Sequence, residues 1–301
     1  MNAPNPNQFD APSADRLARH LADHPPEPVR SVRGWVLFAM AGGLVLAMLL
    51  SAVLPALSLL LLLAPLGLMG FLAKRAQQTR ELHQRVGRVW ELAMLREHRE
   101  ALRRAWTLLP QVKHHPDLHL RCVAVMGHTL DDLAQYSSAM VAFDHLLEHL
   151  PANHPMALQT RVQRANAALC DDQLADADDT LRKLRGSIEQ LPPGPIPASY
   201  QLAKLVQDVR TGHFAEAAQH ADDTATKLQP LGVHAGYGYG LLAYCHHQLA
   251  LRSDDPATAA KQKQDAEKHW HNATLLIPPA ALAHRYRELA AMLTPHNNTG
   301  Q

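Results

Sequence analysis

The hydrophobic pattern divides the chain into one long apolar run and a longer region of amphipathic helices. The 40 residues from Gly34 to Ala73 carry no charged side chain, whereas one membrane-spanning helix needs about 20 apolar residues. Pro55 lies near the middle, where it can open a second helix after a tight turn. The run therefore predicts a transmembrane helical hairpin over 33–74, with helices at 34–54 and 55–73.

Basic residues flank this run on both sides. Arg30 and Arg33 precede it, and Lys74, Arg75 and Arg80 follow it. Because cytoplasmic flanks carry the excess of Lys and Arg, both ends of the hairpin are predicted to be cytoplasmic. The sequence thus predicts an integral protein of the inner (cytoplasmic) membrane, with both termini and the region after the hairpin in the cytoplasm.

The ends of the chain have a different composition. Residues 1–32 are rich in Pro, Asn and Asp and predict a disordered tail, as do residues 296–301. Ser13 could cap a short helix that places Leu17 and Leu21 on one side. A fraying turn within the tail is the preferred interpretation of this segment.

A spaced pattern of small and apolar residues recurs after Lys74. In each copy an alanine is followed four residues later by a second packing residue, three further on by a third, and then by a proline. The alanines lie 38, 38, 40 and 49 residues apart at Ala101, Ala139, Ala177, Ala217 and Ala266. A small residue on the second helix of a hairpin allows close approach of the first helix, and the proline is expected to end the helix. We call these five alanines, with the packing residues that follow each of them, the alanine ladder. The ladder predicts stacked helical hairpins over 75–295.

The turn motif "GHFAEA", Gly212 to Ala217, marks the junction between two helices of such a hairpin, and "REHREA" has Arg96 where the glycine would be. On these motifs, the alanine ladder and Gly127, the region from Arg80 to Leu293 resembles the tetratricopeptide repeat (TPR) family. The resemblance implies an all-α solenoid of helical pairs. The period exceeds the family's 34 residues, so a divergent solenoid of another type stays open. Residues 252–264 are an insertion, and 281–293 are the expected capping helix.

The resemblance also implies a concave surface formed by the first helix of each hairpin. The candidate residues for this partner-binding groove are a mixed polar set: Arg121, His128, Asp131, Gln159, Gln163, Asn166, Lys204 and Arg210. Such a mixture favours a protein or peptide partner. The net charge of +1 gives no basic surplus for nucleic acid. Val162 lies one turn before Asn166 where a carboxylate-clamp protein has Lys, so chaperone-tail binding is not predicted.

The segment "HLLEH", residues 145–149, matches the inverted zincin pattern H-x-x-E-H. A zincin needs His145 and His149 in a cleft, Glu148 as the base and a third protein ligand. No downstream motif identifies that ligand, and the repeat pattern places these histidines on a solvated face. The preferred interpretation assigns no metal, no cofactor and no catalytic residue.

Other histidines and the cysteines are assigned to structure. "HHPDLH", residues 114–119, could gather three imidazoles, but a polar loop is preferred. The histidines of "HWH", His269 and His271, are expected at the surface. Cys122, Cys170 and Cys245 are expected to pack as small apolar residues on first helices.

The sequence therefore predicts a non-enzymatic, membrane-anchored scaffold or adaptor that binds a protein or peptide at the cytoplasmic membrane face, with residues 34–73 in the lipid bilayer. The alternative is a membrane-bound zinc-dependent hydrolase that uses the "HLLEH" segment. A third hypothesis makes the protein a subunit of a membrane complex, with its hairpin packing through Gly42, Gly43 and Ala47.

Overall fold

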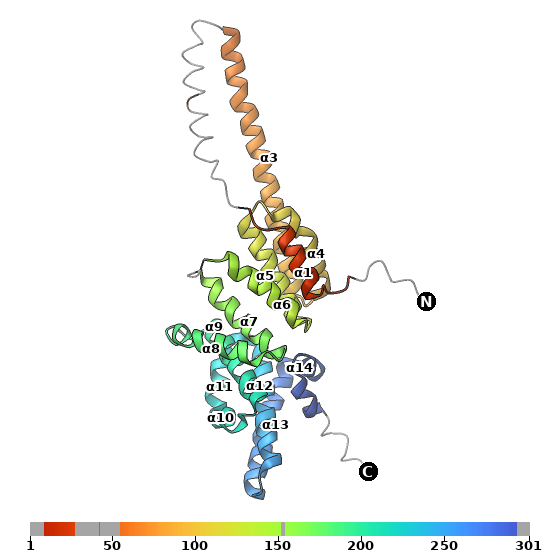
Figure 1. Cartoon of the computed structure of the whole chain (residues 1–301), viewed down its shortest axis with the longest axis vertical. Coiled ribbons are helices and arrows are strands. Elements are labelled where there is room, and N and C mark those ends of the chain that lie inside the picture. The colour runs from red at the N-terminus through yellow and green to blue at the C-terminus, as the bar shows by residue number, and fades with distance from the viewer. Residues whose placement is uncertain (1–8, 28–41, 43–54, 152–153, 294–301) are drawn as a thin grey trace, which may run out of the picture. The chain divides into compact units, whose positions relative to one another are not determined.

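The computed structural model describes residues 9–27, 42, 55–151 and 154–293, with the backbone alone over 55–68 (Figure 1). Every regular element in these ranges is an α-helix or a 3-10 helix, so the all-α prediction is confirmed for them. The chain forms two compact units. The first holds the described residues up to Val125 apart from Asp10–His20, and the second holds Asp10–His20 and the residues from Met126 onward.

The helices follow one another with short connections. They are α1 (Ala14–Asp23), α3 (Pro55–Met94), α4 (His98–Val112), α5 (Pro116–Asp132), α6 (Tyr136–His149), α7 (Pro155–Cys170), α8 (Leu174–Glu189), α9 (Pro195–Thr211), α10 (Phe214–Gln219), α11 (Ala221–Leu228), η1 (Gln229–His234), α12 (Ala235–Arg252), α13 (Pro256–Leu276), α14 (Pro279–Arg285) and η2 (Arg287–Leu293).

The predicted transmembrane hairpin is not supported. Residues 34–41 and 43–54 lie outside the described residues, and 55–73 form the start of α3, which runs on through Lys74 and Arg75 to Met94. Within the part of the chain that is described, no helix has the length and hydropathy needed to cross a membrane. The predicted localisation, an integral membrane protein with cytoplasmic termini, is therefore corrected.

The short helix that Ser13 could cap is present as α1. The Ser13 hydroxyl accepts from the backbone N–H of Arg16 at 3.4 Å, and Leu17 and Leu21 are 0% and 2% exposed. Ser138 of α6 donates its hydroxyl to the carbonyl of Pro12 at 2.9 Å. The interpretation of this segment as a fraying turn is wrong, because both leucines of its apolar face are buried. The other residues of the predicted tails, 1–8, 28–32 and 296–301, lie outside the described residues.

Four turns between helices share one backbone conformation. Each contains a residue with positive φ: 63° at Arg96, 57° at Ala134, 62° at Asp172 and 79° at Gly212. The next residue's N–H bonds to the carbonyl five positions back, which together with positive φ makes a Schellman motif; these bonds run from Glu97 to Leu92, Gln135 to Leu130, Gln173 to Ala168 and His213 to Asp208. The turn residues are spaced like the first four alanines of the ladder. The sequence period thus corresponds to a repeated backbone geometry, which Arg96 adopts without being glycine.

The alanine ladder lies in the core. Ala101, Ala139, Ala177, Ala217 and Ala266 are all buried, and so are the apolar residues one turn after them apart from the half-buried Trp270. A Cβ atom at Gly127 of α5 would lie 2.7 Å from the Phe143 ring of α6. Glycine is therefore required where α5 and α6 cross.

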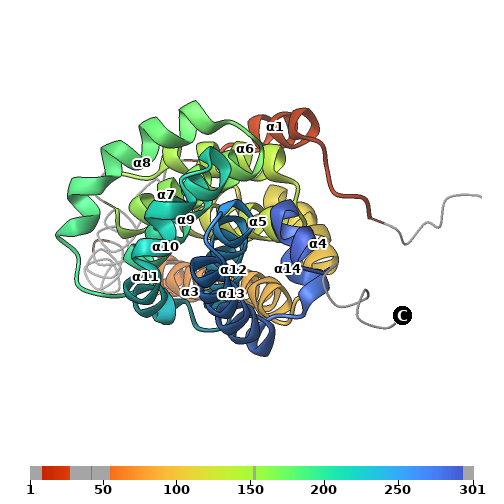
Figure 2. The same cartoon turned by 90° about the horizontal axis from the view of Figure 1, so that it is seen from below.

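In the second unit the first helices of successive hairpins lie side by side. Helix α7 packs against α9, and α9 packs against α12, an order that can be followed in Figure 2. Helix α8 packs on both α7 and α9, and α13 packs along α12. This arrangement places the ends of α5, α7 and α9, with their turns, beside the C-terminal segment α14–η2, as the ion pairs described below show.

The ladder fails to predict three helix ends. Pro110 lies inside α4, which continues to Val112, although proline removes one backbone hydrogen bond there. The second helix after Gly212 is divided at His220 into α10 and α11. The expected capping helix is divided at Tyr286, whose φ and ψ of −122° and 105° are extended. That break turns the Tyr286 ring into the core, where it is 0% exposed.

Candidate binding surface

The residues predicted to line a groove occupy three first helices. Arg121, His128 and Asp131 lie on α5, the residues Gln159, Gln163 and Asn166 lie on α7, and Lys204 and Arg210 lie on α9. Arg121 is exposed and belongs to the first unit, and the other seven belong to the second unit. These seven differ widely in burial and in bonding partners.

Asp131 and Arg210 are bound by the chain's own C-terminal segment. Arg285 at the end of α14 pairs with Asp131 and, at 3.2 Å, with Asp132, and its carbonyl accepts from the Tyr136 hydroxyl at 2.8 Å. The side chains of Asp131 and Arg285 are 12% and 11% exposed. Asp131 is therefore held in a buried ion pair rather than presented to a partner.

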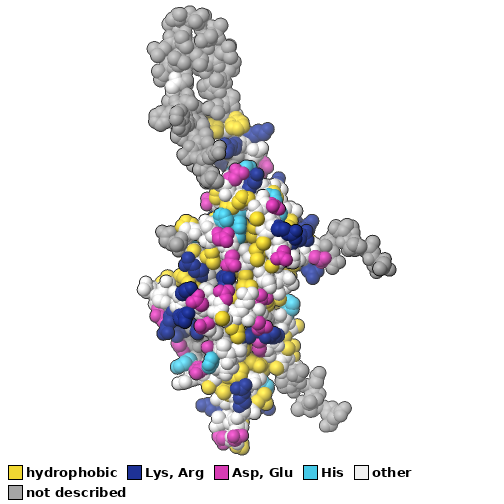
Figure 3. Space-filling view, in the orientation of Figure 1, with side chains coloured by type: hydrophobic (Ala, Val, Ile, Leu, Met, Phe, Trp, Pro, Cys, Tyr) yellow, Lys and Arg dark blue, Asp and Glu magenta, His cyan; other side chains and the backbone are white. Residues whose placement is uncertain are grey.

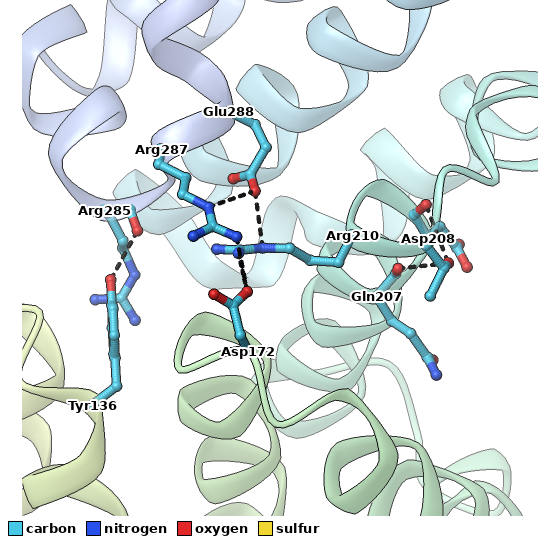
Figure 4. A network of polar contacts seen from close by, with 9 residues as sticks. Tyr136, Asp172, Gln207, Asp208, Arg210, Arg285, Arg287 and Glu288 are labelled. Carbon is cyan, nitrogen blue, oxygen red and sulfur yellow. Dashed lines mark hydrogen bonds and ion pairs between the residues drawn. The ribbon is translucent and has the colours of Figure 1, made fainter.

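Arg210 is held in a similar way one hairpin further on. Its guanidinium pairs with Asp172 at 2.7 Å and with Glu288 of η2 at 3.0 Å, and its side chain is 6% exposed. Arg287 adds a second pair to Asp172 at 2.9 Å. Figure 4 shows the Arg210, Asp172, Arg287 and Glu288 side chains converging between the turn after α7, the end of α9 and η2.

His128 and Asn166 point into the core. The His128 ring meets the Phe143 ring edge-on, with 5.9 Å between centroids, and burial lowers the pKa of His128 below its usual range. Asn166 is 9% exposed, and its Oδ1 atom has no hydrogen-bond partner among the described residues. A buried acceptor without a partner costs about 1–3 kcal/mol, so Asn166 has bonding capacity that the described structure leaves unused.

Lys204 lines a recess at the surface of the second unit. This recess, between α8, α9 and α10, has a volume of about 610 Å³ and is lined by Leu174, Ala175, Asp178, Lys204, Gln207, Asp208, Thr211, His213 and Glu216. The Lys204 ammonium donates to Gln207 Oε1 at 2.7 Å, and Gln207 Nε2 donates to Asp178 Oδ1 at 2.7 Å. Gln159 and Gln163 are half-buried on α7 and do not line the recess.

The recess carries more acid than base. Asp178, Asp208 and Glu216 contribute three carboxyl groups against the single ammonium of Lys204. Burial raises the pKa of Asp208 above its usual range, partly offset by Lys204 and His213. By contrast, Lys and Arg are interspersed with Asp and Glu over the face shown in Figure 3. The recess is therefore a local acidic site on a surface of mixed charge.

Sequence reasoning missed Asp178 and Glu216 because it considered first helices alone. Asp178 belongs to α8 and Glu216 to α10, the second helices of two hairpins. Asp208 lies one turn after Lys204 on α9, so helical spacing could have identified it.

The "HLLEH" residues are brought together on α6. The ligand atoms of His145, Glu148 and His149 all lie within 4.8 Å of one another. Burial, followed by the neighbouring His149, lowers the pKa of His145 to about 4. Among the described residues, this is the one group of three or more His, Cys, Asp or Glu with metal-ligand spacing.

The other histidine clusters do not gather in this way. In "HHPDLH", His114 bonds Glu27 at 2.8 Å whereas His119 is 0% exposed. The surface prediction for "HWH" is wrong for His269, which is 3% exposed and stacks on His246 of α12 with 5.5 Å between ring centroids. His271 is exposed, as predicted, and Trp270 between them is half-buried, because α13 turns its His269 face toward α12.

The three cysteines are buried, as predicted, on the first helices α5, α7 and α12. Burial raises the pKa of each thiol to about 12. Thiols with such pKa values stay protonated near neutral pH, which fits packing rather than nucleophilic chemistry.

Comparison with known proteins adds no assignment. No family model, no curated protein and no solved structure matches this chain. The interpretation therefore depends on the residues themselves.

Proposed function

We propose that the second unit is a divergent TPR-like array that acts as a non-enzymatic scaffold and binds a segment of another protein. The four turns with one geometry and the buried alanine ladder support the repeat assignment. Stacked hairpins of this kind create extended binding surfaces from neighbouring repeats.

The binding site that we propose is the recess between α8, α9 and α10. The observation that carries it is the presence of Asp178, Asp208 and Glu216 around one surface hollow of about 610 Å³. Its floor is organised by the bonds from Lys204 to Gln207 and from Gln207 to Asp178. A hollow of this size accepts one or two side chains of a bound segment.

The partner segment is expected to carry Lys or Arg. Three carboxyl groups exceed the positive charge of Lys204, and a carboxylate can pair with an incoming ammonium or guanidinium. The C-terminal segment covers Asp131 and Arg210, so the proposed contact surface excludes these two residues.

Selection from a displayed peptide library on the full chain tests this function. Selected peptides are expected to be basic, and binding measured by fluorescence polarisation is expected to weaken at least about tenfold, or ~1.4 kcal/mol, in the Asp178→Asn, Glu216→Gln double variant. Glu189→Gln is the matched control, since Glu189 lies on α8 outside the recess.

Two outcomes would overturn the proposal. One is a set of peptides that bind the double variant and the wild type equally. The other is a recess that takes the small polycation spermine but selects no peptide, which would make it a small-molecule site. A photo-crosslinking residue at Ala175, compared with one at the exposed Ser187 of the same helix, locates the bound peptide independently.

A further inference from the structure

The last turn of α6 carries three potential metal ligands on one face. His145 and His149 are one helical turn apart, Glu148 lies between them, and their ligand atoms fall within 4.8 Å of one another. The ring centroids of His145 and His149 are 4.3 Å apart, with 37° between the ring planes. Residues at i, i+3 and i+4 are neighbours on a helix surface, so the backbone itself holds the three donors together.

A hydrogen bond fixes the orientation of one imidazole. His149 Nδ1 lies 2.8 Å from the carbonyl oxygen of His145. A carbonyl oxygen only accepts, so Nδ1 carries the proton and Nε2 is left with its lone pair. Donation of the second ring N–H to a backbone carbonyl is the usual outer support of a metal-binding histidine. His149 is therefore oriented for coordination through Nε2.

The position on the helix also favours a cation. Helix α6 ends at His149, with Leu150 as its C-cap, and the C-terminal end of a helix has partial negative charge. Glu148 adds a full negative charge when ionised. The field at this end of α6 thus attracts a divalent ion and does not oppose it.

We propose that His145, Glu148 and His149 form a binding site for a divalent transition metal ion of the zinc class. Two imidazoles and one carboxylate are a donor set that zinc accepts, and tetrahedral bonds of about 2.0–2.1 Å place donors roughly 3.3 Å apart. Rotation of the side chains has to bring the ligand atoms closer to one another by at most ~1.5 Å to reach that spacing. The fourth position is then open to water or to a ligand from another molecule.

This site differs from the zincin motif that the sequence suggests. In a zincin the glutamate is a base and not a ligand, whereas the geometry here makes Glu148 a third donor. The inference therefore concerns metal binding on the scaffold, independently of the peptide recess, and assigns no hydrolytic reaction.

Calorimetric titration of the metal-free full chain with Zn²⁺ tests the site. The wild type is expected to bind one equivalent in its first step. His149→Ala is expected to weaken that step at least about tenfold, the smaller end of the effect that even outer-sphere changes have on zinc sites. Glu148→Gln is expected to weaken it less, because the amide retains a neutral oxygen donor.

His271→Ala is the matched control, since His271 is also an exposed histidine near a helix C-terminus. The chain has 20 histidines, so weaker later steps are expected in every variant and do not bear on the first one. Co²⁺ in place of Zn²⁺ gives a second readout, because its visible absorption reports the coordination geometry directly.

The inference fails if the wild type shows no stoichiometric first step. It also fails if His149→Ala and His145→Ala bind Zn²⁺ like the wild type, or if His271→Ala removes the step. Far-UV circular dichroism of each variant establishes that lost binding is not lost folding. His149 is exposed, so its replacement is expected to leave the fold intact.

Discussion

Two pairs of histidines in the second unit use the same side chain in opposite ways. His145 and His149 share one helix and lie at its surface end, one half-buried and the other exposed. His246 and His269 come from the packed helices α12 and α13 and are 5% and 3% exposed, with their rings parallel to within 7°. The first pair can reach a ligand from solvent. The second pair fills the core between two helices.

Hydrogen bonding separates the pairs as clearly as burial does. His246 Nδ1 lies 2.6 Å from Gln262 Oε1 and donates to it. His246 Nε2 and His269 Nδ1 are buried with no partner among the described residues. Each such atom costs about 1–3 kcal/mol, so packing must offset this cost. The comparison shows that a histidine can bind a metal ion or another ligand only where one of its ring nitrogens is accessible to solvent.

The largest difference between the pairs is expected in stability. His269→Ala leaves a cavity in the α12–α13 interface and is expected to lower the free energy of unfolding by about 2–4 kcal/mol. His149→Ala is expected to change it by no more than about 0.5 kcal/mol. Urea denaturation followed by circular dichroism measures both, with His271→Ala, two residues from His269 on the same helix, as the surface control. Equal losses for His149→Ala and His269→Ala would remove the distinction.

A smaller difference is expected in chemical reactivity. Diethyl pyrocarbonate should modify His149 readily, whereas His246 and His269 react only when the α12–α13 pair opens, at rates at least about 100-fold lower. Peptide mass spectrometry gives the rate at each site. Zn²⁺ should protect His145 and His149 without changing the other two. Rapid modification of His269 in the folded chain would show that this pair is not a core element.

The smallest expected effect is on the pH dependence of stability. Burial, followed by His246 and Lys268, lowers the pKa of His269 below 6.5, against the opposing effect of Asp222 and Asp265. Below pH 6.5 the unfolded chain then binds a proton that the folded chain does not, so stability falls as the pH is lowered through this window. The slope for one such proton is at most about 1.4 kcal/mol per pH unit.

His269→Gln removes this contribution. The stability difference between wild type and His269→Gln should therefore shrink as the pH falls from 7 to 5, and contributions from the other histidines cancel in the difference. Urea denaturation at several pH values measures it. A difference that stays constant over this range would contradict the lowered pKa of His269.

The parts of the fold that repeat could be predicted from the sequence. The alanine ladder is buried because one residue per turn must face the neighbouring helix, and this pattern is local. The junction at Arg96 was identified by its position in the ladder, and the backbone there has the same positive φ as at Gly212. Three unlike residues and one glycine adopt this turn, so the spacing carried more information than the residue type.

The contacts that do not repeat could not be predicted. Asp131 and Arg210 were candidate groove residues because they lie on first helices, but Arg285 and Glu288 bind them from the C-terminal segment. Nothing in the local pattern links residues so far apart. His269 was misplaced for a similar reason. The repeat pattern predicted that Trp270 packs, but the orientation of α13 against α12 decides which of the residues beside Trp270 are buried.

The predicted membrane hairpin illustrates a different limit. The apolar run was interpreted from composition and length alone, whereas the helix that includes its second half extends without a break into the charged residues after Ala73. Composition does not determine where a helix ends when no glycine or proline follows the run.

The ion pair between Arg285 and Asp131 joins residues 154 positions apart in the sequence. Repeat arrays with contacts only between neighbours can begin folding at any hairpin and lengthen from there, and their local contacts make folding fast. Here the hairpins can form one after another as the chain leaves the ribosome. Asp131 acquires its partner Arg285, and the Asp172–Arg210 pair acquires Arg287 and Glu288, only after α14 and η2 have been synthesised. The second unit is therefore closed only once α14 and η2 are present, by residues that the repeat itself does not contain.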